Sequence, residues 1–496
     1  MSINTVTNEK NQTVESEVQA LERKQYVKMT QMPIAKLIIS LGIPTTLSMM
    51  ITSLYNLADT YFVSLLGNDS ITAAVSNLLA LMSIIQAVGF TYGMGSGSIV
   101  SRLLGKRDRE GADKVLSSSF FIALCSGLVI LTFGMLFLTP LMKLLGSVKP
   151  AVLGYSQKYA RFILLAAPFM CMSFVMNNVL RAEGKAVLSM VGLIVGAVLN
   201  VALDPLFIFV FNMGITGAAL ATFLSQITSF CVLLGMFLSH RTVTRLRIRS
   251  ISKKFAVYGE VIATGFPSFC RQVLASLCTV FLNQNAQIYG NMLGDEGGEA
   301  AQAAFGVVQK MFMLAFSISL GIGQGYQPFL GYNYSSKRYD RVRKGYLFTL
   351  GFSISLMTAF SVFCAIFAPS LMHLFSLSDT ATQIGTLSLR LQCICMPLLP
   401  VNFMISITYQ VVGNKALASL LSISRQGLFY LPAIMILPKF LQLFGVQCAQ
   451  SISDFFSFLF AIPFMFHFFK DLKRLEEQSK EEQMDEQVCV ETDFLE

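Results

Sequence analysis

The feature that most constrains this 496-residue sequence is a series of long, nearly uncharged apolar blocks. A helix crosses a bilayer with about 20 mostly apolar residues. The first half of the chain contains such blocks at 34–63, 71–100, 115–142, 186–211 and 214–239. Counted along the whole chain, they predict about twelve transmembrane helices. The expected fold class is therefore an all-α polytopic membrane protein.

The composition agrees with lipid as the solvent for most of the chain. Only 13% of the residues are charged, whereas about a quarter are charged in soluble proteins. The net charge of +9 could indicate a nucleic-acid partner, but the basic residues lie in short loops between apolar blocks, as membrane topology requires. The expected partners are the bilayer and small organic molecules, without nucleic acid.

The distribution of charge in the loops predicts the orientation of the chain. The stretch from Arg241 to Lys254 has six basic residues and no acidic one, and Lys337–Lys344 has five basic residues and one acid. Basic loops stay on the cytoplasmic side of a membrane. We therefore expect a multi-pass protein of the inner (cytoplasmic) membrane with both termini in the cytoplasm. Residues 1–32 lack an apolar core near their start, so the first span is expected to act as its own insertion signal.

The two halves of the sequence resemble each other, which predicts two six-helix lobes. Gly42-Ile43-Pro44 and Gly265-Phe266-Pro267 open the first and seventh spans, and Gly-x-Gly-x-Gly runs starting at Gly93 and Gly321 end the second and eighth. Lys106-Arg107 is matched with Lys337-Arg338, Gly184 with Gly413, and Pro205 with Pro432. Because six spans return the chain to its starting side, the repeat is parallel. The glycine runs indicate close helix packing.

This repeat gives the expected domain organisation. The chain divides into a cytoplasmic N-terminal segment (1–32), an N-lobe (33–240), a basic cytoplasmic linker (241–254), a C-lobe (255–470) and an acidic cytoplasmic tail (471–496). The tail lacks apolar periodicity and is expected to be disordered or loosely helical.

Charged residues inside the apolar blocks are the candidate site residues, because a charge near the bilayer centre costs at least about 2.5–3.5 kcal/mol. The N-lobe has Asp59 in the first span and Asp204 in the fifth. Asn200 lies four residues before Asp204 and therefore shares its helix face. Pro205 lacks the N–H that would bond the Val201 carbonyl, which leaves that oxygen available to a cation.

Depth estimates from the helical rise of ~1.5 Å per residue bring these residues together with Thr222 of the sixth span, in one half of the lobe. Hard oxygen donors suit an alkali cation, and a carboxylate can instead carry a proton. The corresponding positions of the C-lobe lack carboxylates. Function is the favoured interpretation for Asp59 and Asp204, and the alternative is a polar network that only holds helices together.

The C-lobe contains Arg271, Arg390, Arg425 and Asp454 within its apolar blocks. The same rise estimate puts Arg271 and Asp454 at similar depths, which favours a structural ion pair between them.

Together, these motifs resemble the multidrug and toxic compound extrusion (MATE) family over residues 33–470. The resemblance rests on Asp59, Gly93 to Lys106, Arg181-Ala182-Glu183-Gly184, Asn200 to Pro205, and Gly217 to Thr222. It implies two six-helix lobes in a V, and multidrug efflux by antiport against inward Na⁺ or H⁺. It also implies that Asp59, Asn200, Asp204 and Thr222 form the cation-coupling site, and that Tyr61 and Tyr159 lie near the N-lobe substrate cavity. Some members carry acidic residues in spans seven and ten, where this chain has Arg271 and Arg390 instead.

A flippase and an enzyme are the two alternative functions. A flippase for lipid-linked precursors can use a related bilobed fold, but it would tend to line its first lobe with cationic residues for pyrophosphate. An enzyme is not expected, because no paired histidines, metal-ligand cluster or nucleophile–base set is present. No cofactor is expected beyond the coupling ion, no metal beyond Na⁺ at the cation site, and the ten cysteines lack a CxxC pair. A monomer is expected.

Overall fold

The computed structural model describes residues 19–64, 69–147, 149–239, 241–294, 297–375 and 378–493, which are helical with no strand among them. Eleven helical segments in this part are long and apolar enough to cross a membrane. The last segment, Lys415–Glu481, contains two spans, because the chain leaves helical geometry at Gln442 (φ 51°, ψ −133°). The structure thus has twelve spans, as the sequence predicts.

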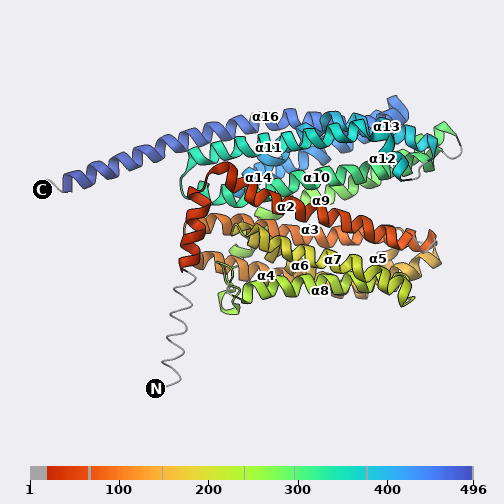
Figure 1. The fold of residues 1–496 in the computed structure, drawn as a ribbon, viewed down its shortest axis with the longest axis horizontal. Coiled ribbons are helices and arrows are strands. Elements are labelled where there is room, and N and C mark those ends of the chain that lie inside the picture. The colour runs from red at the N-terminus through yellow and green to blue at the C-terminus, as the bar shows by residue number, and fades with distance from the viewer. Residues whose placement is uncertain are drawn as a thin grey trace, which may run out of the picture.

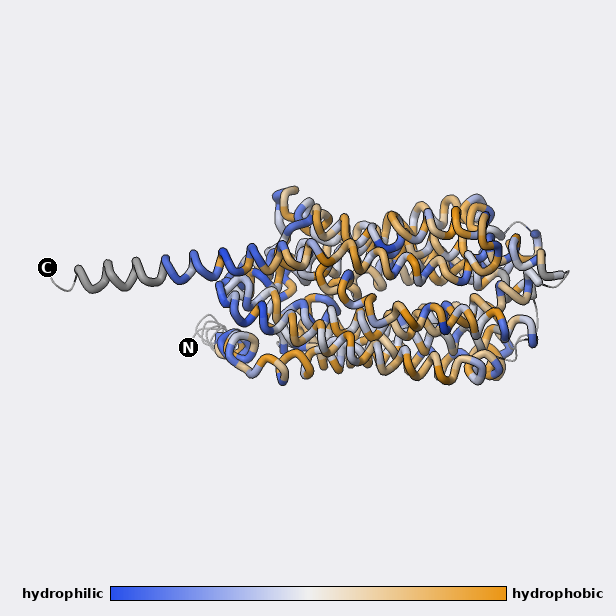
Figure 2. Tube along the Cα trace, turned by 90° about the horizontal axis from the view of Figure 1, so that it is seen from above, coloured by the Kyte–Doolittle hydropathy of each residue, from blue (hydrophilic) through white to orange (hydrophobic). Residues whose placement is uncertain are grey.

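The spans form two bundles that lie side by side (Figures 1 and 2). The N-lobe consists of α2 (Ile34–Ser64), α3 (Asp69–Gly105), α4 (Arg109–Leu136), α5 (Leu138–Leu144), α6 (Pro150–Ala182), α7 (Ala186–Pro205) and α8 (Ile215–Leu238). The C-lobe consists of α9 (Phe255–Gly290), α10 (Gly297–Ser335), α11 (Tyr339–Ile366), α12 (Ala368–Leu374), α13 (Asp379–Cys395), α14 (Leu399–Val412), α15 (Lys415–Ile423) and α16 (Leu431–Asp493). Short π-helical turns, Leu206–Val210 and Ser424–Tyr430, follow α7 and α15.

The predicted repeat is visible in the backbone of matching turns. Gly184 and Gly413 both have positive φ, 78° and 103°, after the fourth and tenth spans. Arg107 (φ 60°) and Lys337 (φ 56°) adopt the left-handed region before the third and ninth spans. The sequence matched Lys106-Arg107 with Lys337-Arg338, so the structural register is shifted by one residue, with Arg107 opposite Lys337.

A second pair of turns shows how the same backbone can be built from different residues. Gly214 (φ 56°, ψ −135°) begins the sixth span, and Gln442 adopts nearly the same angles before the twelfth. Only glycine visits this region without strain. Three residues later, Gly217 and Gly445 each pack against the backbone of the preceding helix. Because Gln442 is not a glycine, this turn could not be recognised from the sequence.

The glycine motifs lie where the two lobes meet. A Cβ on Gly265 of α9 would overlap the Thr91 carbonyl of α3, and one on Gly95 of α3 would overlap the backbone of Val261. The predicted close approach of helices is thus confirmed, and its partner is the opposite lobe.

The reciprocal contact joins α10 to α2. A Cβ on Gly325 would lie 2.6 Å from the Cα of Gly42, and one on Gly321 would overlap Thr46. A Ser53–Ser317 hydrogen bond of 2.6 Å also connects these helices. The lobes therefore pack through two related helix pairs, α3–α9 and α2–α10.

The linker between the lobes is fastened to the N-lobe through its backbone. The Glu183 carboxylate accepts hydrogen bonds from the backbone N–H groups of Val243 and Thr244, both at 2.8 Å. The Asp113 carboxylate accepts one from the N–H of Arg245 at 2.7 Å. The donors in these three hydrogen bonds are backbone N–H groups of the linker.

The N-terminal segment bridges the lobes at the same end of the molecule. Residues 19–31 are helical, and Tyr26 lies under the Arg107 guanidinium of the N-lobe at 4.3 Å. Arg338 of the C-lobe donates to the Thr30 carbonyl at 2.8 Å. At the other terminus, α16 continues as a helix to Asp493, beyond the bundle (Figure 1).

Candidate functional site

The structure brings the predicted N-lobe residues together. The Asn200 side-chain amide lies 3.3 Å from Asp204 Oδ1 on its own helix, α7. The same nitrogen lies 3.4 Å from Thr222 Oγ1 of α8. Asp204 is fully buried, and Asn200 and Thr222 are nearly so. The depth estimates made from the sequence were therefore accurate for this set.

Asp59 of α2 completes the cluster together with Tyr159 of α6. The Asp59 carboxyl lies beside both the Asp204 carboxyl and the Tyr159 hydroxyl, and that hydroxyl also lies near Thr222. Tyr159 has no exposed surface. Four helices, α2, α6, α7 and α8, thus contribute to one buried polar cluster, which we call the N-lobe cluster: Asp59, Tyr159, Asn200, Asp204 and Thr222.

Several oxygen atoms of this cluster have no hydrogen-bond partner among the described residues. Oδ1 of Asp59, Oδ2 of Asp204 and Oδ1 of Asn200 are buried and have no hydrogen-bond donor among the described residues. The two carboxyl groups nevertheless interact with each other. No ion pair in the described part of the chain joins either carboxyl to a Lys or Arg. Buried acceptors without donors are costly, so a proton or cation would satisfy them.

Two further polar side chains approach this cluster and were missed on the sequence. Tyr55 and Gln226 interact with each other, and Tyr55 lies near both Asp59 and Asp204. Tyr55 precedes Asp59 by four residues, and Gln226 follows Thr222 by four. The i,i+4 spacing that linked Asn200 to Asp204 would have identified both residues.

The backbone changes its hydrogen-bonding pattern directly after Asp204. The Leu206 N–H donates to the Leu203 carbonyl, one residue away from its α-helical partner. A π-helical turn follows, in which the Phe211 N–H donates to the Leu206 carbonyl at 3.0 Å. Pro205, which cannot donate, therefore marks the start of an irregular segment beside the cluster. Such π-turns often occur at functional sites.

Of the two tyrosines expected near a substrate cavity, only Tyr159 can be placed. Its side chain belongs to the buried cluster and contacts the carboxyl of Asp59. Tyr61 lies on α2, but its side chain falls outside the described residues.

The ion pair of the C-lobe differs from the one expected. Asp454 pairs with Arg425, whose Nε lies 2.7 Å from Oδ1 of the carboxylate. Arg271 does not reach Asp454, and its guanidinium lies over the Phe403 ring at 5.1 Å. Equal depth along two helices does not fix the direction in which each side chain points, which explains the error. Arg390 is exposed at the bundle surface and donates to the Ala365 carbonyl.

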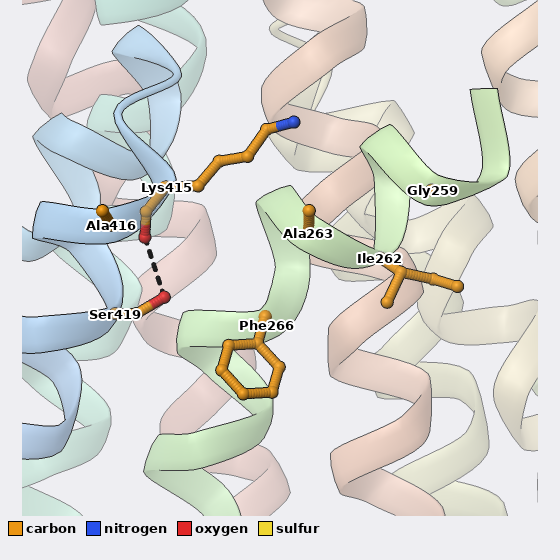
Figure 3. Close-up of a pocket in the computed structure, with 7 residues that line it drawn as sticks. All are labelled: Gly259, Ile262, Ala263, Phe266, Lys415, Ala416 and Ser419. Carbon is orange, nitrogen blue, oxygen red and sulfur yellow. Dashed lines mark hydrogen bonds between the residues drawn. The ribbon is translucent and has the colours of Figure 1, made fainter. Parts of the chain in front are cut away.

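An open hollow lies between α9 and α15, away from the N-lobe cluster. It has a volume of about 440 Å³ and is lined by apolar residues of α9 and α15, among them Ile262, Ala263 and Phe266 (Figure 3). Lys415 extends across its rim, and its carbonyl accepts the Ser419 hydroxyl at 2.8 Å. None of the N-lobe cluster lines this hollow.

Comparison with known proteins identifies the family. The sequence profile of the MatE family matches residues 44–206 and 273–436, one segment in each lobe. This chain belongs to the MATE family. MATE proteins are transporters, and the match of one profile to both lobes agrees with the internal repeat.

Relatives and solved structures cover nearly the whole MATE fold. The multidrug export protein MepA of Staphylococcus aureus is 24% identical over 438 residues, which are 88% of this chain and 94% of MepA. A structure described as the outward-facing conformation of a multidrug resistance MATE family transporter superposes with a TM-score of 0.83. It is 28% identical and covers 91% of this chain and 98% of its own. A MATE in the straight conformation, 26% identical, also has a TM-score of 0.83, over 92% of this chain and 99% of its own.

Proposed function

We propose that this MATE protein exports lipophilic, often cationic, organic compounds in exchange for inward H⁺ or Na⁺. Multidrug export is the activity in the name of the relative MepA. The observation that carries the proposal is the N-lobe cluster, in which two carboxyl groups meet inside the membrane part without a basic partner among the described residues. We assign Asp59, Asn200, Asp204 and Thr222 to ion coupling, and Tyr61 and Tyr159 to the adjacent substrate cavity.

The chemistry of the cluster supports exchange between a cation and a proton. Two carboxylates close together in a low dielectric repel each other, so at least one binds a proton or a cation. The partner-free oxygens of Asp59, Asn200 and Asp204 are hard donors of the kind that alkali cations prefer. A cationic organic substrate would compete for the same negative charge. Competition of this kind couples the inward movement of one cation to the outward movement of another.

The test is gradient-driven dye efflux from proteoliposomes that contain the purified protein. Under an imposed Na⁺ or H⁺ gradient, Asp204→Asn should abolish coupled efflux, because the amide cannot change its charge. The matched control is Leu431→Asn, near the corresponding place in the C-lobe, which should retain coupling. Wild-type efflux rates in Asp204→Asn at equal protein density would contradict the assigned role. Separate Na⁺ and H⁺ gradients distinguish the coupling ions.

A flippase for lipid-linked precursors is the second candidate. Such a substrate carries a pyrophosphate, which basic side chains bind. The N-lobe cluster offers carboxyl groups instead, which favours cationic substrates. The same proteoliposomes distinguish the two, because flipping would appear as transfer of a labelled lipid between leaflets without dye accumulation.

We also propose that the protein is a monomer with both termini and the linker in the cytoplasm. The basic linker supports this orientation. Arg247 and Glu299 are both exposed, near opposite ends of α9. In a cysteine-free background, an impermeant thiol reagent applied outside cells should label Glu299→Cys and spare Arg247→Cys. The reverse pattern would invert the topology, and light scattering of the purified protein tests the monomer.

A further inference from the structure

The C-lobe contains a largely buried group of charges that the proposed coupling site does not use. It consists of Arg271 of α9, Arg425 of the π-turn after α15, and Asp454 of α16. Two guanidinium groups and one carboxylate leave an excess positive charge. An uncompensated charge in a membrane span costs several kcal/mol, so this group calls for a compensating ligand.

Arg271 has few partners for its five N–H donors. Among the described residues it donates one hydrogen bond, to the Ser268 hydroxyl at 3.3 Å. Its other contact is the stacking of the guanidinium on the Phe403 ring. Neither contact supplies a negative charge.

Asp454 forms its ion pair with Arg425 and none with Arg271 among the described residues, and its Oδ2 is buried without a hydrogen-bond partner there. Its Oδ1 accepts from Arg425 Nε at 2.7 Å and from the Gln450 amide at 2.9 Å. Arg425 stacks on Phe312 at 4.9 Å, and its Nη2 is buried without a partner in the described part of the chain. The pair is thus neutral overall but still has a free donor.

Both arginines line one small cavity. Asn402, Ser422 and Gln426 add polar atoms to its wall. The volume open to the centre of a water molecule is about 20 Å³, enough for one small group and too little for a drug-sized molecule. The cavity is therefore small, and its wall combines two guanidinium groups and a few polar atoms with the apolar side chains of Phe316, Leu399 and Phe403.

We propose that this cavity binds a single monovalent anionic group between Arg271 and Arg425. The chemistry fits a halide ion or the carboxylate of a transported organic molecule, because guanidinium groups bind such anions through parallel N–H donors. The bound anion neutralises the excess charge and satisfies the donors of Arg271 and Arg425. Anion binding does not depend on the export activity proposed above.

The first experiment measures binding without transport. The protein in nanodiscs is melted in sodium chloride, in sodium benzoate, and in the sodium salt of a morpholine sulfonate, whose three-oxygen head is larger than a chloride ion or a planar carboxylate, all at equal Na⁺. A bound anion should raise the melting temperature by roughly 2 °C or more over the sulfonate. Arg271→Gln should lose this increase, and the matched control Arg390→Gln should keep it.

The second experiment identifies the source of the anion. Efflux of a rhodamine dye with a free carboxylate is compared with efflux of its methyl ester. If a substrate carboxylate occupies the cavity, Arg271→Gln should slow the acid at least about fivefold more than the ester, a selectivity typical of a charged hydrogen bond. If a halide occupies it, chloride should stabilise the wild type and both dyes should respond equally to the mutation.

The proposal fails if chloride and benzoate leave the wild-type melting temperature unchanged relative to the sulfonate. It also fails if Arg271→Gln and Arg390→Gln respond alike to these salts. Should Arg271→Gln not fold, Arg271→Lys provides the test, because a single ammonium should weaken benzoate binding while preserving the charge. If every variant loses dye efflux while the salt effect on the melting temperature is intact, the result counts against the export proposal and not against anion binding.

Discussion

Equivalent helices in the two lobes each hold a cluster of polar side chains. The N-lobe cluster contains carboxyl groups, whereas the C-lobe cluster (Arg271, Arg425 and Asp454) has an excess of positive charge. In the N-lobe, spans one, four, five and six contribute to the cluster, and spans one and five supply its two carboxyl groups. In the C-lobe, spans seven, ten, eleven and twelve supply the polar residues, among them two arginines and one carboxylate, and span eight adds Phe316 to the wall of the cavity. Counted from the matched turns before the sixth and twelfth spans, Thr222 corresponds to Gln450, and Gln226 to Asp454. Polar side chains thus recur at equivalent places with different chemistry.

Some features recur in both lobes because the fold requires them, and others differ because the fold tolerates the difference. The positive-φ turns and the glycine contacts recur in both lobes, because backbone geometry and close helix packing depend on them. The charges in the clusters do not recur. The scaffold therefore does not dictate them, and each cluster can bind a different ion on the same framework.

The greatest loss of stability is expected from a substitution in the Arg425–Asp454 ion pair of the C-lobe. Asp454→Asn leaves Arg425 buried without its carboxylate, which should destabilise the protein by about 3–5 kcal/mol. Asp204→Asn should change stability little, because it removes one of two repelling carboxyl groups and strands no cation. Thermal melts of the two purified variants measure the difference. The double variant Asp454→Asn/Arg425→Gln should recover part of the loss, and equal destabilisation by both single variants would contradict the contrast.

A smaller effect on stability is expected at the contact between the lobes, where the glycines of the two lobes differ in the space available for a Cβ. A Cβ on Gly265 would overlap the Thr91 carbonyl, whereas one on Gly42 would find Ile322 at 4.0 Å. Gly265→Ala should therefore lower stability by about 1–3 kcal/mol through overpacking, and Gly42→Ala should be tolerated. Melting temperatures of the two variants decide the matter, and equal values would show that the lobes adjust freely at this contact.

The smallest effect is expected on ion-coupled efflux, from a substitution of Thr222 in the N-lobe cluster. Thr222→Ala removes the weak contact with Asn200 at 3.4 Å, which should reduce ion-coupled efflux about 2–10-fold, the equivalent of one hydrogen bond. Ser225→Ala is the control, because the Ser225 hydroxyl bonds the Ala221 carbonyl of its own helix. Initial rates of dye efflux in proteoliposomes should fall for the first variant only. A comparable decrease in both would place the effect in helix packing rather than in the cluster.

Much of the fold and of the N-lobe cluster was predictable because both follow from one-dimensional rules. Apolar block length gave the spans, and the helical rise gave the common depth of Asp59, Asn200, Asp204 and Thr222. The same rule paired Arg271 with Asp454 wrongly, because depth alone ignores the direction of the side chain around the helix axis. The partners of the glycine motifs were also out of reach, since packing between lobes is not a local property of the sequence.

The attachment of the linker to the N-lobe determines where the covalent joint between the lobes lies. The Ser252 N–H is still held by Ser118 of α4 at 2.9 Å, and α9 begins at Phe255. The covalent joint is therefore confined to a few residues at one end of a helix of 36 residues, which is about 54 Å long. A lever of that length moves its far end by about 0.9 Å for each degree of rotation at the joint. Small rearrangements beside the linker thus become displacements of atomic size at the opposite face of the C-lobe.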